Sequence, residues 1–244
     1  NRNLGSGDGA GIWINLGSLT VERSEFVGNQ TTNGRGAAVY SSVPIVIRDS
    51  LFRDNDAADG GAIWTNDAMN IQRSLFDGNS ASGQAGALRL NGGSNALIVS
   101  STFVNNEGGA LGAVFAGASF SRFRLAFVTI ANNRAASGAP AELPVLGDFG
   151  GYDLAYVLLD NPGIDDCGAG TGLQSVAESR SSDTSCNEDD FPAADQGVDP
   201  MLGSLADNGG PTPTRALIAG SPAIDAGDDG VCPAVDQRGF PRAD

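Results

Sequence analysis

The sequence predicts an all-β fold, a right-handed single-stranded parallel β-helix with coils of about 26 residues and an irregular C-terminal end. Three observations predict it. A hexapeptide of the form Ser-x-Phe-x-x-Asn recurs, other columns of side chains keep the same spacing, and hydrophobic residues alternate within short segments without a helical period. Because a single coil cannot bury its inward face, successive coils stack, and identical positions lie above one another.

The recurring hexapeptide marks one corner of successive coils. Its copies read SEFVGN, SLFRDN, SLFDGN and STFVNN, followed by the related VTIANN and the degraded YVLLDN. The asparagines that end the first five copies are expected to form a ladder of amide-to-amide hydrogen bonds, while the phenylalanines stack in the interior. The ladder residues are Asn29, Asn55, Asn79, Asn106 and Asn133.

Two further columns keep this period. An aliphatic residue precedes each serine position by three residues, as Val21, Ile47 and Ile71 illustrate. Earlier in each unit a pair of small residues precedes a hydrophobic one, as in Gly61-Ala62-Ile63, which lets the chain bend inward at a corner. A barrel built from hairpins is the competing fold, but it would not hold columns at a spacing of 24–27 residues.

The period dissolves after residue 162. The sequence therefore predicts regular coils over 1–162, a loop over 163–198, and irregular final coils with a C-terminal cap over 199–244, all in one domain. Of the three cysteines, Cys167 and Cys186 lie in the loop, and their pairing would leave Cys232 free. Two other pairings remain open on the sequence alone. A disulfide here would indicate an oxidising compartment.

The composition excludes several kinds of chemistry. The chain has no histidine, and its 14 basic residues are all arginine. It therefore lacks the groups for a Ser-His-Asp or Cys-His site, a Schiff-base lysine or a histidine-bound zinc. The net charge of −15 would repel nucleic acid and anionic lipid, so neither is expected as a partner. No apolar run approaches the roughly 20 residues of a membrane helix, so membrane insertion of this segment is not expected.

Two resemblances rest on these motifs. Gly-Gly-Ala-Ile at 60–63 with Phe-x-x-Asn resembles the repeats of chlamydial polymorphic outer-membrane proteins, surface adhesins built on a β-helix. The stretch DPMLGSLADNGGPTPTRALIAGSPAIDAG, with a cysteine and then DQRGFPR, resembles the end of bacterial choice-of-anchor Q proteins, secreted right-handed β-helix proteins of the pectin-lyase-like class. The second resemblance implies export and surface display, with a signal peptide and an anchor outside this chain, and implies no common catalytic residues.

The pectin-lyase-like class also contains enzymes, so a carbohydrate-binding or polysaccharide-cleaving, lyase-type β-helix is the alternative function. Polygalacturonase-like members carry a Gly-His-Gly and an Arg-x-Lys beside their aspartates, whereas this chain has only the pair Asp165-Asp166. A lyase needs Ca²⁺ held by carboxylates and a basic residue. Here the arginines alternate with aspartates in outward columns, as Arg53 and Asp77 do, which indicates exposed cross-coil ion pairs. The residues favour a non-enzymatic role, and no catalytic residue is assigned.

Calcium is the one cofactor with a sequence signal. GSGDGAG at 5–11 matches a single copy of a glycine-aspartate repeat, and NEDDF at 187–191 and DAGDDG at 225–230 cluster carboxylates. Aspartates that cap backbone amides in solvated turns explain the same letters. We therefore expect no cofactor and assign no metal ligand.

One column exceeds what the fold requires. The residue after each corner aliphatic is predicted to point outward, and in five units it is aromatic or arginine. Exposed, the stacked rings would form a platform for sugar rings or a protein partner. Covered by a loop or by the C-terminal tail, they would form a second small core, and this second interpretation is favoured. The column comprises Trp13, Tyr40, Trp64, Arg89 and Phe115.

The predicted function is therefore structural or adhesive, as a secreted or cell-surface bacterial β-helix with a polysaccharide or protein partner. Nothing before Gly9 resembles an amphipathic cap, and open strand edges invite pairing with other chains. Head-to-tail stacking of the chain with itself into an extracellular fibre is accordingly a further expectation.

Overall fold

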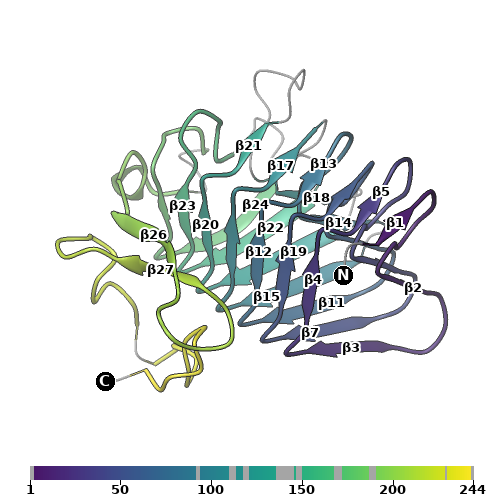
Figure 1. The fold of residues 1–244 in the computed structure, drawn as a ribbon. Helices are drawn as coiled ribbons and strands as arrows, with labels where there is room; N and C mark the ends of the chain where they lie inside the picture. The colour runs from purple at the N-terminus through teal and green to yellow at the C-terminus, as the bar shows by residue number, and fades with distance from the viewer. Residues whose placement is uncertain are drawn as a thin grey trace.

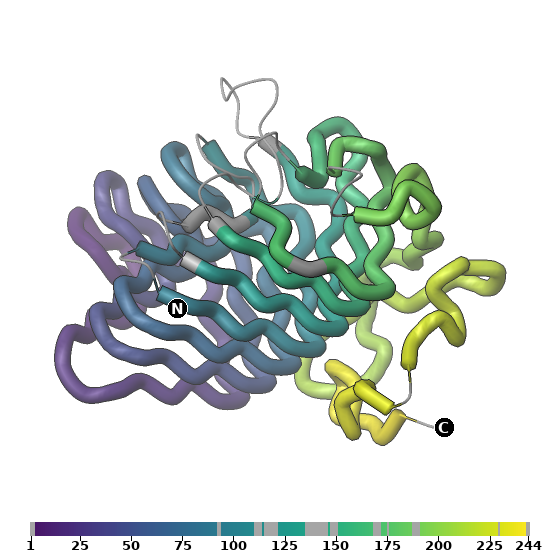
Figure 2. Tube along the Cα trace, turned by 180° about the vertical axis from the view of Figure 1, so that it is seen from behind, coloured from purple at the N-terminus to yellow at the C-terminus, as the bar shows by residue number. Residues whose placement is uncertain are grey.

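A computed structural model describes residues 3–91, 94–109, 114–117, 121–135, 146, 150–167, 172–186, 191–228 and 230–242. It confirms the predicted parallel β-helix: four parallel sheets run along one stack of coils, and one antiparallel hairpin lies beside the stack (Figure 1). Figure 2 shows the coils following one another from the N-terminal end to the green C-terminal coils. Within these described ranges no helix is long and apolar enough to span a membrane.

We name the four parallel sheets the broad, flank, short and aromatic sheets. The broad sheet contains β3 (Leu19–Glu22), β7 (Ile45–Arg48), β11 (Met69–Gln72), β15 (Asn95–Val99), β19 (Ser121–Ala126), β22 (Gly150–Ala155) and β24 (Gly172–Ala177). The flank sheet contains β4 (Glu25–Val27), β8 (Leu51–Arg53), β12 (Leu75–Asp77), β16 (Thr102–Val104), β20 (Thr129–Ala131), β23 (Leu158–Asp160) and β25 (Arg180–Ser181).

The two remaining parallel sheets complete each coil. The short sheet contains β1 (Leu4–Gly5), β5 (Gln30–Thr31), β9 (Asp56–Ala57), β13 (Ser80–Ala81), β17 (Glu107–Gly108) and β21 (Arg134–Ala135). The aromatic sheet contains β2 (Ile12–Ile14), β6 (Val39–Ser41), β10 (Ile63–Thr65), β14 (Leu88–Leu90) and β18 (Phe115–Gly117).

The interior is filled by columns of like side chains. On the broad sheet, Ile47, Ile71 and Ile98 lie in register, each fully buried. On the flank sheet, the rings of the hexapeptide phenylalanines stack at centroid distances of 4.9, 4.7 and 4.6 Å. Burying one such side chain contributes roughly 1.5–3 kcal/mol. The repeat therefore supplies the core of the whole stack, one layer per coil.

Both corners that border the flank sheet need left-handed backbone. Just before the ladder asparagine the residue has φ of 52–65°, and the sequence places there residues that tolerate this region: Gly28, Asp54, Gly78, Asn105 and Asn132. Between the broad and flank sheets the corner residue has φ of 44–56°. This second column, which we name the corner column, comprises Arg23, Asp49, Arg73, Ser100, Phe127, Tyr156 and Glu178.

The segment 163–198, for which the sequence predicts a loop, contains two further parallel strands, β24 and β25. Strand β24 pairs with β22, but the register shifts between Tyr152 and Asp153, so one extra residue enters β24. The extra residue interrupts the alternation of inward and outward side chains in GLQSVA, so the sequence does not read as a strand. The stack thus continues one coil past the predicted boundary, and the 3₁₀-helix η1 (Ala193–Asp195) follows it.

The segment 199–244 does not continue the stack as the expected final coils; its described residues fold back beside it. Strands β26 (Leu202–Ala206) and β27 (Thr214–Leu217) form an antiparallel hairpin, drawn in yellow-green beside β20 and β23 in Figure 1. Leu202 and Leu205 cover a stripe of outward apolar side chains on the flank sheet, namely Leu51, Leu75, Val104 and Ala131. The tail folds back because this apolar stripe on the outside of the coils would otherwise be exposed to water.

Candidate functional site

The predicted aromatic column forms in part, but it is not an open platform. Trp13, Tyr40 and Trp64 lie in register, and their rings are parallel, at centroid distances of 6.2 and 4.8 Å. Arg35 lies 4.3 Å from the Trp64 ring and is held by a bidentate contact with Asp8. Tyr40 is therefore only 8 % exposed and Trp64 4 %, whereas Trp13 is 55 % exposed. Arg35 lies over the rings of both Tyr40 and Trp64, so most of the column is covered.

Phe115 does not belong to this column, which corrects the sequence-based assignment. Strand β18 pairs with β14 so that Phe115 lies beside Leu88, and Ala116 lies beside Arg89. Matching the small-residue pairs of these two coils implies an offset of 26 residues, but the asparagine ladder keeps an offset of 27 through this region. Burial lowers the pKa of the Arg89 guanidinium, which donates to the Leu90 carbonyl oxygen.

The predicted asparagines form a continuous ladder. In each step the side-chain Nδ2 and the backbone N of one asparagine donate to the Oδ1 of the next, at 2.8–3.1 Å. The same Nδ2 donates to a carbonyl of the preceding coil, as Asn79 does to Phe52. The ladder also includes Asn3 before the predicted members and Asn161 after them. Every amide points in one direction along the stack.

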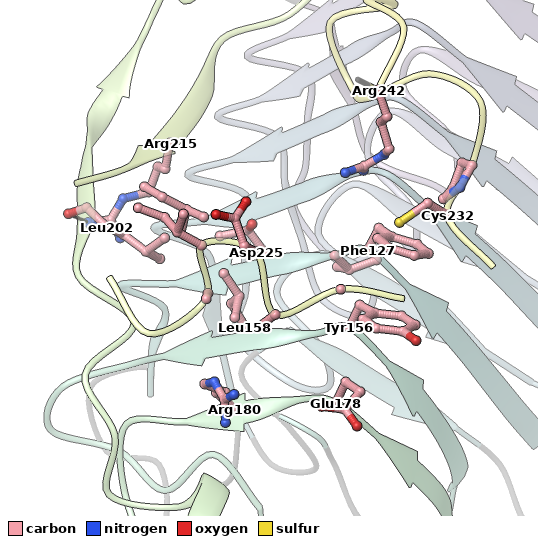
Figure 3. Close-up of a pocket in the computed structure, with 18 of the residues that line it drawn as sticks. Phe127, Tyr156, Leu158, Glu178, Arg180, Leu202, Arg215, Asp225, Cys232 and Arg242 are labelled. Atoms are coloured by element: carbon pink, nitrogen blue, oxygen red, sulfur yellow. Dashed lines mark hydrogen bonds between the residues drawn. The ribbon is translucent and has the colours of Figure 1, made fainter. Parts of the chain in front are cut away.

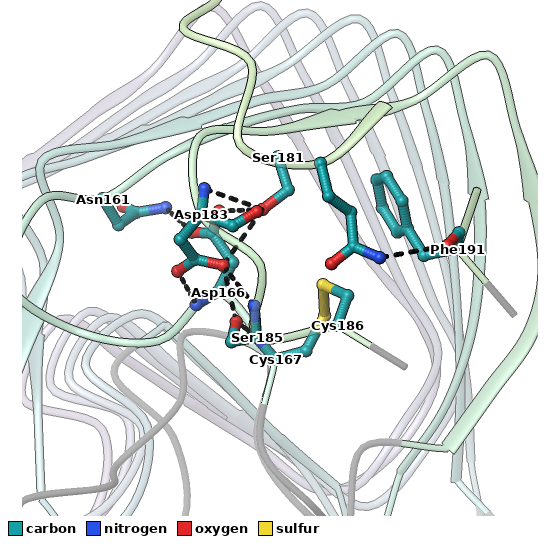
Figure 4. The surroundings of a disulfide bond; sticks show 9 residues. Asn161, Asp166, Cys167, Ser181, Asp183, Ser185, Cys186 and Phe191 are labelled. Carbon is teal, nitrogen blue, oxygen red and sulfur yellow. Dashed lines mark hydrogen bonds between the residues drawn. A yellow bond between two sulfur atoms is a disulfide. The ribbon is translucent and has the colours of Figure 1, made fainter. Parts of the chain in front are cut away.

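The ladder ends on a buried carboxyl group (Figure 4). Asn161 Nδ2 donates to Asp166 Oδ1 at 2.8 Å, and Ser181 Oγ donates to Asp166 Oδ2 at 2.6 Å. Asp183 lies beside it and accepts from the Asp166 backbone N at 2.9 Å. Burial, together with the Asp183 charge, raises the pKa of Asp166 to about 7. This carboxyl group therefore changes charge near neutral pH.

The disulfide joins Cys167 to Cys186 directly below this network, with a Cα–Cα distance of 4.8 Å (Figure 4). Cys232 is free. Both bonded cysteines are buried, and Phe191 packs into the same core. The bridge ties the end of the regular stack to the segment that closes over it.

Replacing Cys167 and Cys186 together by alanine is expected to lower the free energy of unfolding by about 3 kcal/mol. The bridge closes a loop between residues 19 apart in the sequence and so lowers the conformational entropy of the unfolded chain. The loss should appear as a lower urea midpoint under oxidising conditions. Cys232→Ala is the matched control and should leave the midpoint unchanged. A double variant as stable as the parent would show that the bridge contributes nothing to stability.

The outward charges of the coils are paired. Arg53 meets Asp77 at 2.9 Å and Arg73 meets Asp49 at 2.7 Å, each across one coil step. Seven arginines in the described part of the chain make such ion pairs between neighbouring coils. Individually they contribute roughly 0–1 kcal/mol where exposed. Their guanidinium groups are committed to holding neighbouring coils in register.

The three acidic stretches considered for calcium have other partners or lie outside the described residues. Asp8 accepts from Arg35, which lowers the pKa of its carboxyl group. Residues 187–190 and Asp229 are outside the described part. Asp228 caps the backbone N of Gly230. Over the described ranges, no three acidic or thiol side chains converge as a metal ion would require.

A cleft of about 720 Å³ lies between the flank sheet and the C-terminal tail (Figure 3). Figure 3 shows Phe127, Tyr156 and Glu178 of the corner column following one another along one side. Leu202 and Arg215 of the hairpin lie opposite, with Asp225 between the two sides. The repeat does not predict this cleft, because the tail that closes it, residues 199–242, is distant from the coils in the sequence.

The side chains of the cleft are mostly held by neighbours. The rings of Phe127 and Tyr156 stack at 4.6 Å, and Arg242 lies 4.8 Å from the Phe127 ring. The tail is fastened to the flank sheet by a buried hydrogen bond that Thr102 Oγ1 donates to Gln237 Oε1 at 2.7 Å. Gln237 belongs to the DQRGFPR motif, so this motif attaches the tail to the coils.

A second cavity, of about 510 Å³, lies on the broad sheet. It is lined by side chains of neighbouring strands, among them Val46, Asn70, Leu97 and Arg124. Arg124 shares Asp153 with Arg122, at 3.3 and 2.5 Å. Among the described residues that line this cavity there is no aromatic ring.

The comparison with known families agrees with this architecture. A family model described as the right-handed β-helix region matches residues 1–177, which is most of the chain. The chain therefore belongs to the right-handed β-helix family. No curated protein and no solved structure gives a significant match.

Proposed function

We propose that this chain is a secreted or surface-displayed bacterial β-helix that serves as a rigid, non-catalytic structural and adhesive module. The observation that carries the proposal is the commitment of polar side chains to cross-coil ladders and ion pairs. Side chains used in this way hold coils together. Such a stack is suited to presenting a surface at a distance, since each coil contacts only its neighbours and the rod is stiff along its length.

Two observations support export. The Cys167–Cys186 bridge is the kind of bond that persists in oxidising environments. The tail motif that resembles choice-of-anchor Q proteins also has a structural duty here, because Gln237 fastens the tail to Thr102. In that family, this end precedes a surface anchor.

Growth into head-to-tail fibres finds less support than adhesion. Such growth needs matching open strand edges at both ends of the stack. At the C-terminal end, Val198 and Gly197 already donate to Ser181 and Asp183, and Phe191 is buried in the core. The second candidate is carbohydrate binding, which the stacked rings of Phe127 and Tyr156 in the cleft favour.

Antibody labelling of intact and permeabilised cells that produce the chain tests its location, and incubation of the purified chain with polysaccharides tests for turnover. We expect labelling of intact cells and no release of unsaturated, ultraviolet-absorbing products. Labelling only after permeabilisation would contradict surface display. Product release that persists in highly purified protein would contradict the non-catalytic role and favour the lyase-type alternative.

A further inference from the structure

We propose that the cleft between the flank sheet and the C-terminal tail binds a neutral saccharide chain. The proposal names the partner of the adhesive function and rests on that proposed function for its biological role. Its physical basis is separate. It comes from two strained aromatic residues, one buried arginine that fixes the hairpin wall, and the balance of charges in the cleft.

The aromatic pair occupies positions that disfavour it. Phe127 and Tyr156 both have φ of 56°, a region that costs a bulky L-residue roughly 1–2 kcal/mol. At the same corner other coils have Asp49, Arg73 or Ser100, so the fold itself does not require rings there. Strained residues that the surroundings hold in place concentrate at binding sites. The pair places a stacked apolar surface on the cleft wall, which suits the apolar face of a sugar ring.

Arg215 holds the opposite wall of the cleft in place. Its side chain is 10 % exposed, its Nε donates to the Gly203 carbonyl oxygen, and its Nη2 donates to that of Leu202. Nη1 is buried and has no hydrogen-bond acceptor among the described residues, and Asp160 Oδ2 is 3.6 Å away. Nη1 makes an ion pair with Asp160 of the flank sheet. Arg215 therefore fixes the hairpin wall of the cleft against the coils.

The charges of the cleft favour a neutral ligand over an acidic one. Arg180 is paired with Asp195, and Arg215 lies near Asp160. The carboxylates of Glu178 and Asp225 line the cleft in addition, and the chain carries a net charge of −15. Arg242 also lines the cleft, where its guanidinium group lies over the Phe127 ring. A polyanion would meet this one guanidinium group among an excess of carboxylates. Hydroxyl groups can both donate to the carboxylates and accept from Arg242.

The size of the cleft also fits a short saccharide segment. Its volume of about 720 Å³ lies within the roughly 300–1,000 Å³ of sites that bury a drug-sized ligand, so it would take a short segment of a saccharide chain. Its walls come from the corner column, the hairpin and the segment that contains Asp225. A ligand in it would therefore contact coils and tail together, and would hold the tail against the stack.

Isothermal titration calorimetry of the full chain tests the proposal. The probes are cellohexaose, mannohexaose, xylohexaose and laminarihexaose, with hexagalacturonate as the acidic comparator. We expect at least one neutral hexasaccharide to bind more tightly than hexagalacturonate. Binding by none of the neutral probes, or tighter binding of hexagalacturonate, would overturn the proposal and would leave the location and turnover tests of the adhesive role unaffected.

Variants locate the site. The double substitution Phe127→Asn with Tyr156→Asn removes both rings and places a residue that tolerates left-handed backbone, so the fold should be retained, as the melting temperature will show. The dissociation constant should rise roughly tenfold or more, the loss expected for removing aromatic stacking. Trp13→Ala is the control, since Trp13 is an exposed ring outside the cleft. Unchanged binding in the double variant, or loss in Trp13→Ala, would overturn the assignment to the cleft.

Discussion

Replacing Asn79 by alanine is expected to lower the free energy of unfolding by about 4 kcal/mol. The substitution removes two hydrogen bonds that Asn79 Nδ2 donates, to Asn106 Oδ1 and to the Phe52 carbonyl oxygen. It also removes the acceptor of Asn55 Nδ2 and of the Asn55 backbone N. These groups are buried, so the backbone N of Asn55 would be left without a partner and without water. Urea unfolding followed by circular dichroism measures the loss.

Asn70→Ala is the matched control for this prediction. Asn70 lies on the adjoining broad sheet, is partly exposed, and accepts one bond from Gln72. Its replacement should change the free energy of unfolding by less than about 0.5 kcal/mol. Equal effects of the two substitutions would mean that the ladder has no special role in holding the coils together.

The stability of the chain is expected to fall as the pH rises from about 4 to about 7, through the titration of Asp166. Burial raises the pKa of this carboxyl group from its ordinary value of 3.8 to about 7. Between these values the folded state holds a proton that the unfolded state has released, so raising the pH favours unfolding. One pKa unit corresponds to about 1.4 kcal/mol, and the full window to about 4 kcal/mol.

Asp166→Asn isolates this contribution. The amide keeps an oxygen to accept from Asn161 Nδ2 and carries no charge at any pH. Other carboxyl groups, such as Asp8, whose pKa Arg35 lowers, act in the opposite direction and cancel in the comparison. The variant's stability relative to the parent should therefore rise between pH 4 and 7 and remain level above that range. A difference that does not depend on pH would contradict the burial of an uncharged carboxyl group at the end of the ladder.

Much of the coil architecture is predictable from the sequence, because stacking turns a local motif into a column. Phe52, Phe76 and Asn79 take the predicted places in the core and the ladder. The residues that precede the ladder asparagines are Gly, Asp or Asn in the first five copies, which is a readable signal for left-handed backbone. In such a repeat each position has the same surroundings in every coil, so a single motif fixes its environment many times.

The candidate site is not predictable in the same way. The outward leucines of SLFRDN and SLFDGN indicate a covered flank, but the sequence does not show that Leu202 and Leu205 cover it. Phe127 and Tyr156 fall at the start of imperfect repeats, where their alignment with Ser100 is hidden. These features depend on contacts between segments distant in the chain, and no local pattern encodes them. A local pattern predicts the aromatic column, but it does not predict that Arg35, from the turn between β5 and β6, covers it.

Hydrogen exchange of the chain, with and without a mixture of the four neutral hexasaccharides, measures both the rigidity of the coils and the place where the ligand is held. If the ladder makes the coils a rigid scaffold and the ligand lies between the coils and the tail, protection will increase in peptides that contain Tyr156, Arg215 and Asp225. The ladder peptides will be strongly protected in both states. Protection that appears instead at the broad-sheet cavity around Asn70 and Leu97, or no added protection anywhere, would contradict this position of the ligand.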